Sequence, residues 1–195
     1  MSNRVYTYTK VSELKHAPYF KEIAPLPQLT LSREMAVNMS YDMKIFKGNI
    51  MGFLNFSQRL FPGWNTSGQK FVYVTALNRF LRDKIAAVHD RAERDWLFGC
   101  KKNLYAAIQN MIRLEEARVR PEDMEASDRD LSLFLEMWKY LEQLDGSIAA
   151  FRNRLRELEQ PGNFEREAER AFRFHGNKTI VWNGFQFLTP IQKFV

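Results

Sequence analysis

Hydrophobic positions change their spacing about a third of the way along the chain. Before residue 75, apolar residues come in short runs separated by polar and turn-forming residues. From Thr75 onward they recur every three or four residues, so that Leu77, Leu81 and Val88 share one helix face. This spacing predicts helices over about 75–98, 104–118, 127–141, 147–159 and 164–174.

The short apolar runs predict strands in the first part of the chain and one more near its end. They are rich in Val, Ile, Thr and aromatic residues, which favour a pleated sheet. The candidate strands are residues 4–9, 20–24, 50–56, 71–74 and 179–183. Ser32 is expected to cap a helix that runs through Met39. The last strand ends at the turn-forming pair Asn183-Gly184, and Thr189-Pro190 then has the pattern of a helix start.

These elements predict a predominantly helical α/β fold. Its small parallel sheet would combine the N-terminal strands with the C-terminal strand 179–183, interrupted by an insertion of about five helices. The expected domains are an α/β core formed by residues 1–76 with 177–195, and a helical insertion over 77–176. A strand, a tight turn and a helix start near the end of the chain are typical of nucleotide-binding sheets.

Composition favours a soluble protein, expected in the cytoplasm. Hydrophobic residues make up 45% of the chain and charged residues 27%, and no apolar run approaches the roughly 20 residues of a membrane-spanning helix. The N-terminus lacks the apolar segment of a secretory signal. Cys100 is the single cysteine, which excludes an internal disulfide framework and a thiolate zinc cluster.

Positive charge is concentrated in the first part of the chain. Residues 1–76 carry 9 Lys and Arg against 4 Asp and Glu, whereas residues 77–195 carry 20 against 19. A basic segment suits a surface that faces a polyanion. A solvated surface that serves only solubility explains the same excess, so charge alone leaves both interpretations open.

No arrangement of residues predicts catalysis, a metal or a cofactor. The three histidines stand far apart, and no Ser-His-Asp order or pair of catalytic carboxylates is present. The phosphate-loop pattern GxxxxGK[ST] is absent, and Lys70 after Gly68 resembles it weakly. Basic neighbours of Cys100 would lower the pKa of its thiol, but no nearby acid or histidine completes a site, so a structural thiol is predicted.

Two groups of side chains have the chemistry of nucleic-acid contacts. Arg166, Arg170 and Arg173 are spaced four and three residues apart, so they form one helical stripe that suits phosphate binding. Neighbouring glutamates offer them ion pairs instead, and a charged solvated face is the favoured interpretation. A second group of aromatic residues would stack bases or belong to the core, with the core favoured. Its members are Phe53, Phe56, Phe61 and Trp64.

Three segments, taken in order, resemble the N-terminal helicase-like region of the AddB/RexB family, the helicase-like nuclease subunit of bacterial resection complexes. Ile23-Ala-Pro-Leu-Pro-Gln28, followed by Thr30, is similar to that family's strand and Pro-x-Gln turn. Phe53-Leu-Asn-Phe-Ser-Gln-Arg-Leu60 is similar to its next strand and helix start. The segment Ile180 to Gln192 is similar to the part that occupies the position of the helicase Walker B motif.

Departures from that family bear on activity. Many members begin with a phosphate loop, where this chain has Val5 to Phe20. Asn183 stands where the family usually has Asp, and Gln192 stands close to a usual Glu. The nuclease and iron–sulfur cysteines of the family are not in this sequence. The resemblance therefore implies a degenerate helicase-like fold without ATP hydrolysis and without a cofactor.

The resulting hypothesis is a non-catalytic helicase-like module that binds DNA, a helicase or nuclease partner subunit, or both, in recombination or repair. The candidate phosphate contacts are Arg59, Lys70, Arg79, Arg166, Arg170 and Arg173. The alternative is a helical protein–protein interaction module with no nucleic-acid role, such as a regulator encoded by a phage or plasmid. An enzyme with an unrecognised site ranks third.

Overall fold

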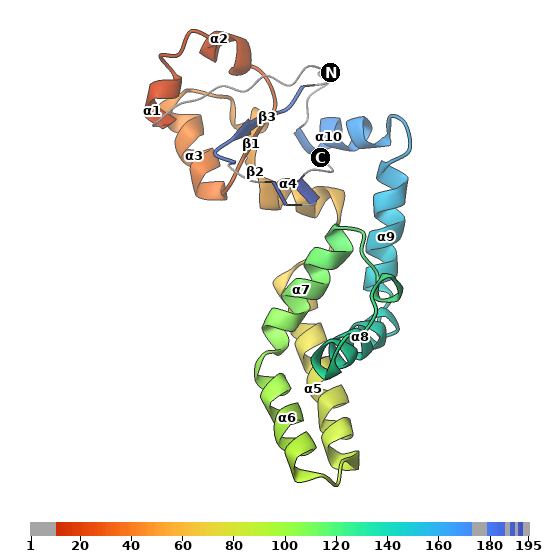
Figure 1. The fold of residues 1–195 in the computed structure, drawn as a ribbon. Coiled ribbons are helices and arrows are strands. Elements are labelled where there is room, and N and C mark those ends of the chain that lie inside the picture. The colour runs from red at the N-terminus through yellow and green to blue at the C-terminus, as the bar shows by residue number, and fades with distance from the viewer. Residues whose placement is uncertain (1–10, 173–178, 186–187, 190, 193–195) are drawn as a thin grey trace. The chain divides into compact units, whose positions relative to one another are not determined.

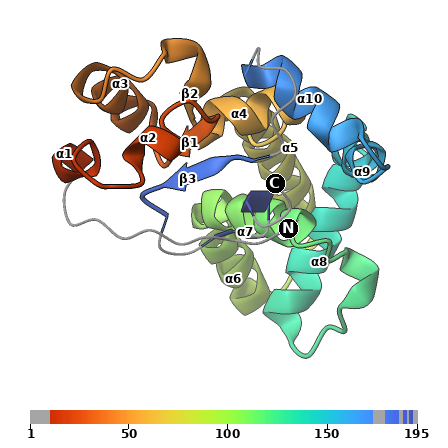
Figure 2. The same cartoon turned by 90° about the horizontal axis from the view of Figure 1, so that it is seen from above.

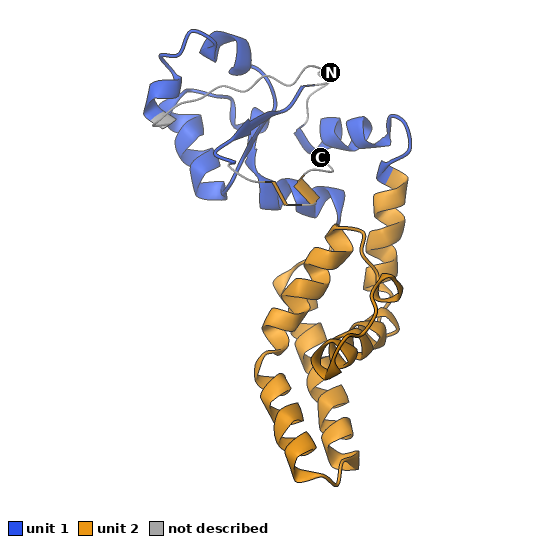
Figure 3. Ribbon diagram, viewed as in Figure 1, with its two compact units in different colours: residues 1–62, 158–187 blue, residues 63–157, 188–195 orange. Residues whose placement is uncertain are grey.

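The computed structural model describes residues 11–172, 179–185, 188, 189, 191 and 192. The chain divides into two compact units, which Figure 3 colours separately: unit 1 comprises residues 1–62 and 158–187, and unit 2 comprises residues 63–157 and 188–195. Most described residues are helical, and one small parallel sheet lies in unit 1 (Figure 1). None of the described helices combines the length and apolar character needed to cross a bilayer.

The sheet of unit 1 joins strands from both ends of the chain. It contains β1 (Gln28–Thr30), β2 (Ile50–Gly52) and β3 (Val181–Asn183) in the order β2-β1-β3, and both pairings are parallel. In register, Leu29 lies opposite Met51 on one side and Trp182 on the other. This arrangement confirms the predicted class, a mostly helical α/β fold whose parallel sheet is closed by a C-terminal strand after a helical segment (Figure 2).

Several predicted strands differ from the observed elements. Residues 20–24 fall in α2 (Phe20–Ile23) and its end, and the neighbouring strand is β1 instead. The run 50–56 is a strand only to Gly52, because α4 (Phe53–Leu60) begins at the next residue. Residues 71–74 lie inside a long helix, α5 (Ser67–Ala87). The predicted strand 4–9 lies outside the described residues.

Unit 1 surrounds its sheet with short helices. Besides α2 and α4 it contains α1 (Val11–Leu14), α3 (Arg33–Asp42), the 3-10 helix η1 (Lys47–Asn49) and α10 (Asn163–Phe172). The predicted cap of α3 is confirmed, because the Ser32 hydroxyl accepts a hydrogen bond of 3.1 Å from the Met35 backbone N–H. Both α3 and α4 pack against the sheet, and α10 packs against α4 through the rings of Phe56 and Phe172, 5.3 Å apart.

Unit 2 is built on α5. Gln69, Tyr73, Leu77 and Leu81 recur every four residues along α5 and are all buried, which places one side of the helix in the core. The helices α6 (Arg91–Lys102), α7 (Leu104–Glu116) and α8 (Arg129–Glu142) pack against it. Between the last two lies the 3-10 helix η2 (Pro121–Asp123), and α9 (Ser147–Leu158) follows α8.

The helical predictions are largely confirmed, with two corrections. The helix predicted over 75–98 is two helices, because α5 ends at Ala87 and Asp90 then caps α6 by accepting a 2.7 Å hydrogen bond from the Glu93 N–H. The helix predicted from Ser127 begins with Asp128 as its cap, whose carboxylate accepts from the Leu131 N–H at 2.8 Å. The other three predictions correspond to α7, α9 and α10, although the expected end of the last lies outside the described residues.

Candidate nucleic-acid interface

The carboxyl edge of the parallel sheet is where open α/β folds usually bind ligands. Thr30, Gly52 and Asn183 end the three strands and lie in register with one another. The helices α3 and α4 begin just beyond the first two strands. A nucleotide-hydrolysing relative would be expected to hold phosphate and metal ligands at this edge.

Asn183 fills its position at this edge with a buried amide. Its side chain is 2% exposed, and Nδ2 donates hydrogen bonds to Gln28 Oε1 at 3.2 Å and to the Leu29 carbonyl at 3.4 Å. Gln28 is fully buried and in turn donates from Nε2 to the Ile23 carbonyl at 3.1 Å. Because an ionised carboxylate cannot donate a hydrogen bond, this network requires the amide that the sequence provides.

Two glycines show how closely the backbone segments meet at the same edge. A Cβ atom placed on Gly52 would lie 2.9 Å from the Arg33 backbone nitrogen, so the end of β2 lies directly against the start of α3. Gly184 has a φ of +79°, which confirms the predicted turn, and a Cβ there would lie 3.0 Å from Met35 Cε. Packing, rather than an open loop, occupies this part of the edge.

Gln192, the second amide at a position where the resembled family has an acid, also has a structural role. It is buried, and its Oε1 accepts a 2.8 Å hydrogen bond from the Thr189 backbone N–H. The Thr189 hydroxyl accepts in return from the Gln192 backbone N–H at 3.4 Å. This reciprocal pair is a capping box, and it confirms Thr189 as the predicted helix start.

Within the described part of the chain, no group of three or more His, Cys, Asp or Glu side chains is placed to hold a metal ion. His16 and His89 are exposed, and His175 lies outside the described residues. Burial raises the pKa of the Cys100 thiol, an effect that the nearby Asp130 carboxylate reinforces. The thiol is therefore less reactive near neutral pH than an ordinary cysteine.

The predicted phosphate contacts of unit 1 lie on α4 and α10. Arg59 donates to the Ala171 backbone carbonyl and so ties α4 to the end of α10. Arg166 donates to Asn163 Oδ1, and Arg170 forms a 2.8 Å ion pair with Glu167. The ion pair fits the interpretation of a charged, solvated face. Arg173, the third member of the stripe, lies outside the described residues.

The predicted contacts of unit 2 lie on α5. Lys70 is half-buried. Burial raises the pKa of the Glu116 carboxyl group, and the charge of Lys70 lies close enough to offset part of that rise. Arg79 is exposed and forms no ion pair with any described residue. Of the five predicted cations that the structure describes, Arg79 is thus the one left most available to a ligand.

Residues 43–82 contain basic residues and no acidic ones, a pattern that is not visible when charges are counted separately before and after residue 76. This segment contains six basic residues and no Asp or Glu: Lys44, Lys47, Arg59, Lys70, Arg79 and Arg82. Most of these side chains are exposed. A run of forty residues with six cations and no carboxylate of its own favours contacts with phosphate groups.

The four aromatic residues considered for base stacking are all in the core. Phe53, Phe56, Phe61 and Trp64 are buried, as the favoured interpretation predicted, and Trp64 stacks on Phe151 with ring centroids 4.0 Å apart. Among the described residues of unit 1, the exposed rings are those of Tyr41 and Phe46, which the sequence reasoning missed. Lys44 and Lys47 beside them were the available signal.

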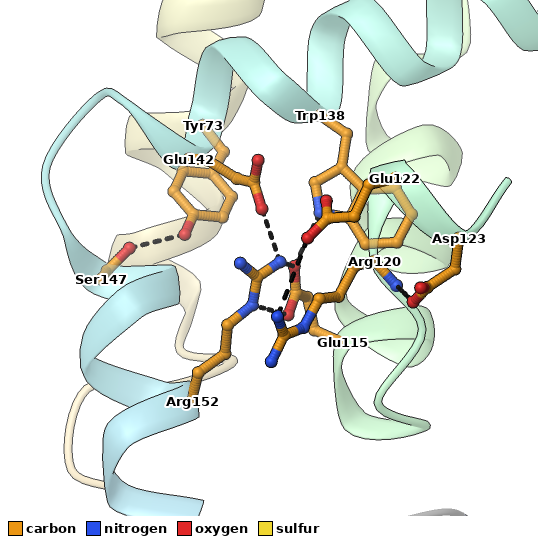
Figure 4. A network of polar contacts seen from close by, with 9 residues as sticks. All are labelled: Tyr73, Glu115, Arg120, Glu122, Asp123, Trp138, Glu142, Ser147 and Arg152. Atoms are coloured by element: carbon orange, nitrogen blue, oxygen red, sulfur yellow. Dashed lines mark hydrogen bonds and ion pairs between the residues drawn. The ribbon is translucent and has the colours of Figure 1, made fainter.

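Unit 2 contains a buried ionic network that the sequence reasoning also missed (Figure 4). Glu115 on α7 is 2% exposed, and it accepts hydrogen bonds from Arg152 Nε and Trp138 Nε1, both at 2.8 Å. Arg152 also pairs with Glu142. Burial raises the pKa of Glu115, and the hydrogen bonds from Arg152 and Trp138 offset part of that rise. This network joins α7, α8 and α9, so the guanidinium of Arg152 has a structural role between these helices.

A second buried carboxylate lies next to the first in sequence. Glu116 accepts hydrogen bonds from Trp64 Nε1 at 3.3 Å and from Asn65 Nδ2 at 3.2 Å, and burial raises its pKa. Nearby, the Tyr73 hydroxyl lies 2.6 Å from the Ser147 hydroxyl, and burial raises the pKa of Tyr73 to about 12. These groups hold helices together and present no open site.

Comparison of the chain with protein-family models, with curated proteins and with solved structures gave no match. The resemblance to the AddB/RexB family therefore stays a prediction.

Proposed function

We propose that this protein is a non-catalytic, helicase-like module of DNA recombination or repair that binds DNA, with or without a helicase or nuclease partner subunit. The observation that carries the proposal is the segment 43–82, with six basic residues and no acidic one. The buried amide of Asn183 supports the non-catalytic part, since it occupies the sheet edge with structural hydrogen bonds. Binding would proceed through ionic contacts between Lys or Arg side chains and phosphates.

Binding of this kind releases counterions and so weakens steeply with salt. Each phosphate contact contributes about 0.9 to the slope of log affinity against log salt for duplex DNA. Affinity for a short fluorescein-labelled duplex and for its single strand is measured by fluorescence anisotropy between about 50 and 200 mM salt. We expect binding to both at the lowest salt and a steep decline for each.

Arg79→Gln tests the proposed contact on α5. The variant is expected to weaken DNA binding several-fold and to lower the salt slope by about 1, because one phosphate contact is lost. Arg91→Gln is the matched control: it removes the same charge from an exposed arginine on α6 that lies 3.9 Å from Asp95. Absence of binding to either DNA at low salt, or binding that salt does not weaken, would contradict the proposal.

The non-catalytic part of the proposal has its own test. Purified protein is assayed for ATP hydrolysis with and without single-stranded DNA, and turnover is expected to stay at background. Turnover above background that disappears in Lys70→Ala would show that the α5 lysine has a catalytic role. That result would overturn the proposal.

Protein binding is a second candidate function, favoured by an exposed apolar pair on α5. Phe71 and Val72 face solvent on the side of the helix opposite its buried stripe. A co-purified partner is compared before and after nuclease treatment. Under this alternative the partner survives nuclease and is lost in Phe71→Ser, while Phe98→Ser, at another exposed phenylalanine of unit 2, retains it. Loss of the partner on nuclease treatment favours DNA binding instead.

A further inference from the structure

Residues 41–49, from the end of α3 to the residue before β2, present two aromatic rings to solvent. Tyr41 is 65% exposed near the end of α3, and Phe46 is 74% exposed just before η1. Two exposed lysines, Lys44 and Lys47, lie in the same nine residues, where Asp42 is the single acidic side chain. Exposed rings among lysines are the combination that single-stranded nucleic-acid sites use, because rings stack on bases and lysines contact phosphates.

The ring of Phe46 is held in place by a glycine. A Cβ atom added to Gly48 would lie 2.6 Å from Phe46 Cε1 and 3.1 Å from Phe46 Cδ1, so the ring rests directly on the backbone of that residue. The turn beneath it is fixed by two hydrogen bonds of Asn49, from its backbone N–H to the Phe46 carbonyl and from Nδ2 to the Pro25 carbonyl. An exposed ring with a fixed position loses less entropy on stacking than a mobile one.

Tyr41 and Lys47 form a second fixed pair. The Lys47 ammonium donates a 3.1 Å hydrogen bond to the Tyr41 hydroxyl and lies 4.6 Å from the centre of the tyrosine ring. These two contacts hold a positive charge beside the exposed ring. A base stacked on the ring would therefore bring its own phosphate close to a lysine.

We propose that Tyr41, Phe46 and Lys47 form a stacking platform for single-stranded DNA. Bases pack on the two rings, and Lys47 with Lys44 contacts the phosphates between them. Duplex DNA keeps its bases stacked on one another and offers this surface only phosphates, so the platform prefers single strands. The inference rests on the proposed function, since it specifies the form of DNA that is bound and the surface of unit 1 that binds it.

Two truncations test the rings directly. Phe46→Ala and Tyr41→Ala are each expected to weaken binding to a single-stranded oligonucleotide about tenfold, within the range observed when stacking aromatic residues are removed. Binding to the duplex of the same sequence should change by less than about twofold, because phosphate contacts dominate there. Phe98→Ala is the matched control, since Phe98 is also an exposed phenylalanine, at 48%, but lies on α6 in unit 2 and outside the segment 43–82. It should bind like the wild type.

Gly48→Ala provides an independent variant that keeps every ring and every charge. The added methyl group displaces the Phe46 ring from its position, so single-strand affinity should fall as in Phe46→Ala. The circular dichroism and the urea midpoint of each variant verify that the fold is retained, which surface substitutions such as Phe46→Ala should not disturb.

The outcomes separate this inference from the proposed function. If Phe46→Ala and Tyr41→Ala bind single strands like the wild type while Arg79→Gln still weakens binding, the platform is wrong and DNA binding stands. If the ring variants lose duplex and single-strand affinity equally, the platform is also wrong, because stacking is not involved. If the wild type binds no DNA at low salt, both the platform and the proposed function fail.

Discussion

Asn183 Nδ2 lies 3.2 Å from Gln28 Oε1, although 155 residues separate the two in the chain. Both side chains are buried, and they lie on adjacent strands of the sheet. The contact fixes the edge strand β3 against β1 through one amide–amide hydrogen bond in addition to the backbone ladder. Because this contact needs a side chain at position 183 that donates a hydrogen bond, the residue at that position affects the stability of unit 1.

Asn183→Asp is expected to destabilise unit 1. The carboxylate has no hydrogen to donate to Gln28 Oε1 or to the Leu29 carbonyl, and it would be buried beside both oxygens. The expected loss in the free energy of unfolding is about 2 to 4 kcal/mol at neutral pH. Urea unfolding measures the loss, with Asn38→Asp at an exposed position of α3 as the control.

The loss in Asn183→Asp should also depend on pH. Burial would raise the pKa of the new carboxyl group above its unfolded value, so its unfavourable effect is smallest when the group is protonated. The deficit relative to the wild type should shrink as the pH falls toward about 4. A deficit that is equal at all pH values would mean that burial of an ionised carboxylate is not its cause, and would contradict this prediction.

Gly52→Ala and Gly99→Ala should have effects of opposite sign. Gly52 has an ordinary φ of −69°, but the added methyl group would lie 2.9 Å from the Arg33 nitrogen, which a rigid backbone cannot relieve easily. We expect a loss of about 1 to 3 kcal/mol. Gly99 lies inside α6 with no atom within 4 Å of the added group, so its replacement should stabilise by about 0.5 to 1 kcal/mol. Thermal unfolding distinguishes these outcomes.

Arg152→Met should destabilise unit 2 strongly. Removing the guanidinium leaves Glu115 buried without its ionic partner, for an expected loss of about 3 to 5 kcal/mol in urea unfolding. Adding Glu115→Gln should recover part of that loss, since the buried charge is then removed as well. Arg91→Met, which breaks an exposed pair with Asp95, should change stability by less than about 0.5 kcal/mol. Equal effects of the two arginine variants would show that the network is not buried in solution.

Glu116→Gln should become more stable relative to the wild type as the pH rises. Burial raises the pKa of Glu116 in the folded state, so its contribution to stability is present below the ordinary carboxyl pKa of 4.5 and is lost as the pH rises through the raised value. Glutamine keeps an oxygen that accepts from Trp64 and Asn65 without becoming charged. Urea midpoints from about pH 4 to pH 7 test this. Glu125→Gln, at an exposed glutamate, is the control and should show no such trend.

The sequence predicted best those elements whose signals are local. Ser32 and Thr189 cap helices with their own side chains, and the apolar spacing of α7 and α8 is visible without a partner. Residues 71–74 were wrongly predicted to form a strand, because aromatic and β-branched residues favour strands. In the structure the buried positions of α5 recur every four residues from Gln69. Helical packing overrode the local preference there.

Other features depend on residues far away in the chain, so local patterns do not contain them. β1 has polar residues, Gln28 and Thr30, at two of its three positions, and they are buried because β2 and β3 flank the strand and α3 and α4 pack against it. Glu115 resembles a solvent-facing glutamate until Arg152, 37 residues later, pairs with it. The exposure of Tyr41 and Phe46 was not predicted either, because an aromatic residue by itself gives no sign of whether its ring is covered, and the neighbouring Lys44 and Lys47 were only an indirect signal.

Because β3 is translated long after β1 and β2, the sheet stays incomplete during much of synthesis on the ribosome. β1 and β2 emerge first, but one side of β1 has no hydrogen-bonding partner until residues 181–183 have been translated. The helices α5, α6 and α7 contact near neighbours in sequence and are able to fold during that interval. Throughout it, the nascent chain carries an open strand edge, which is a template for pairing with other chains. That edge stays open for as long as the ribosome translates the helical segment between β2 and β3.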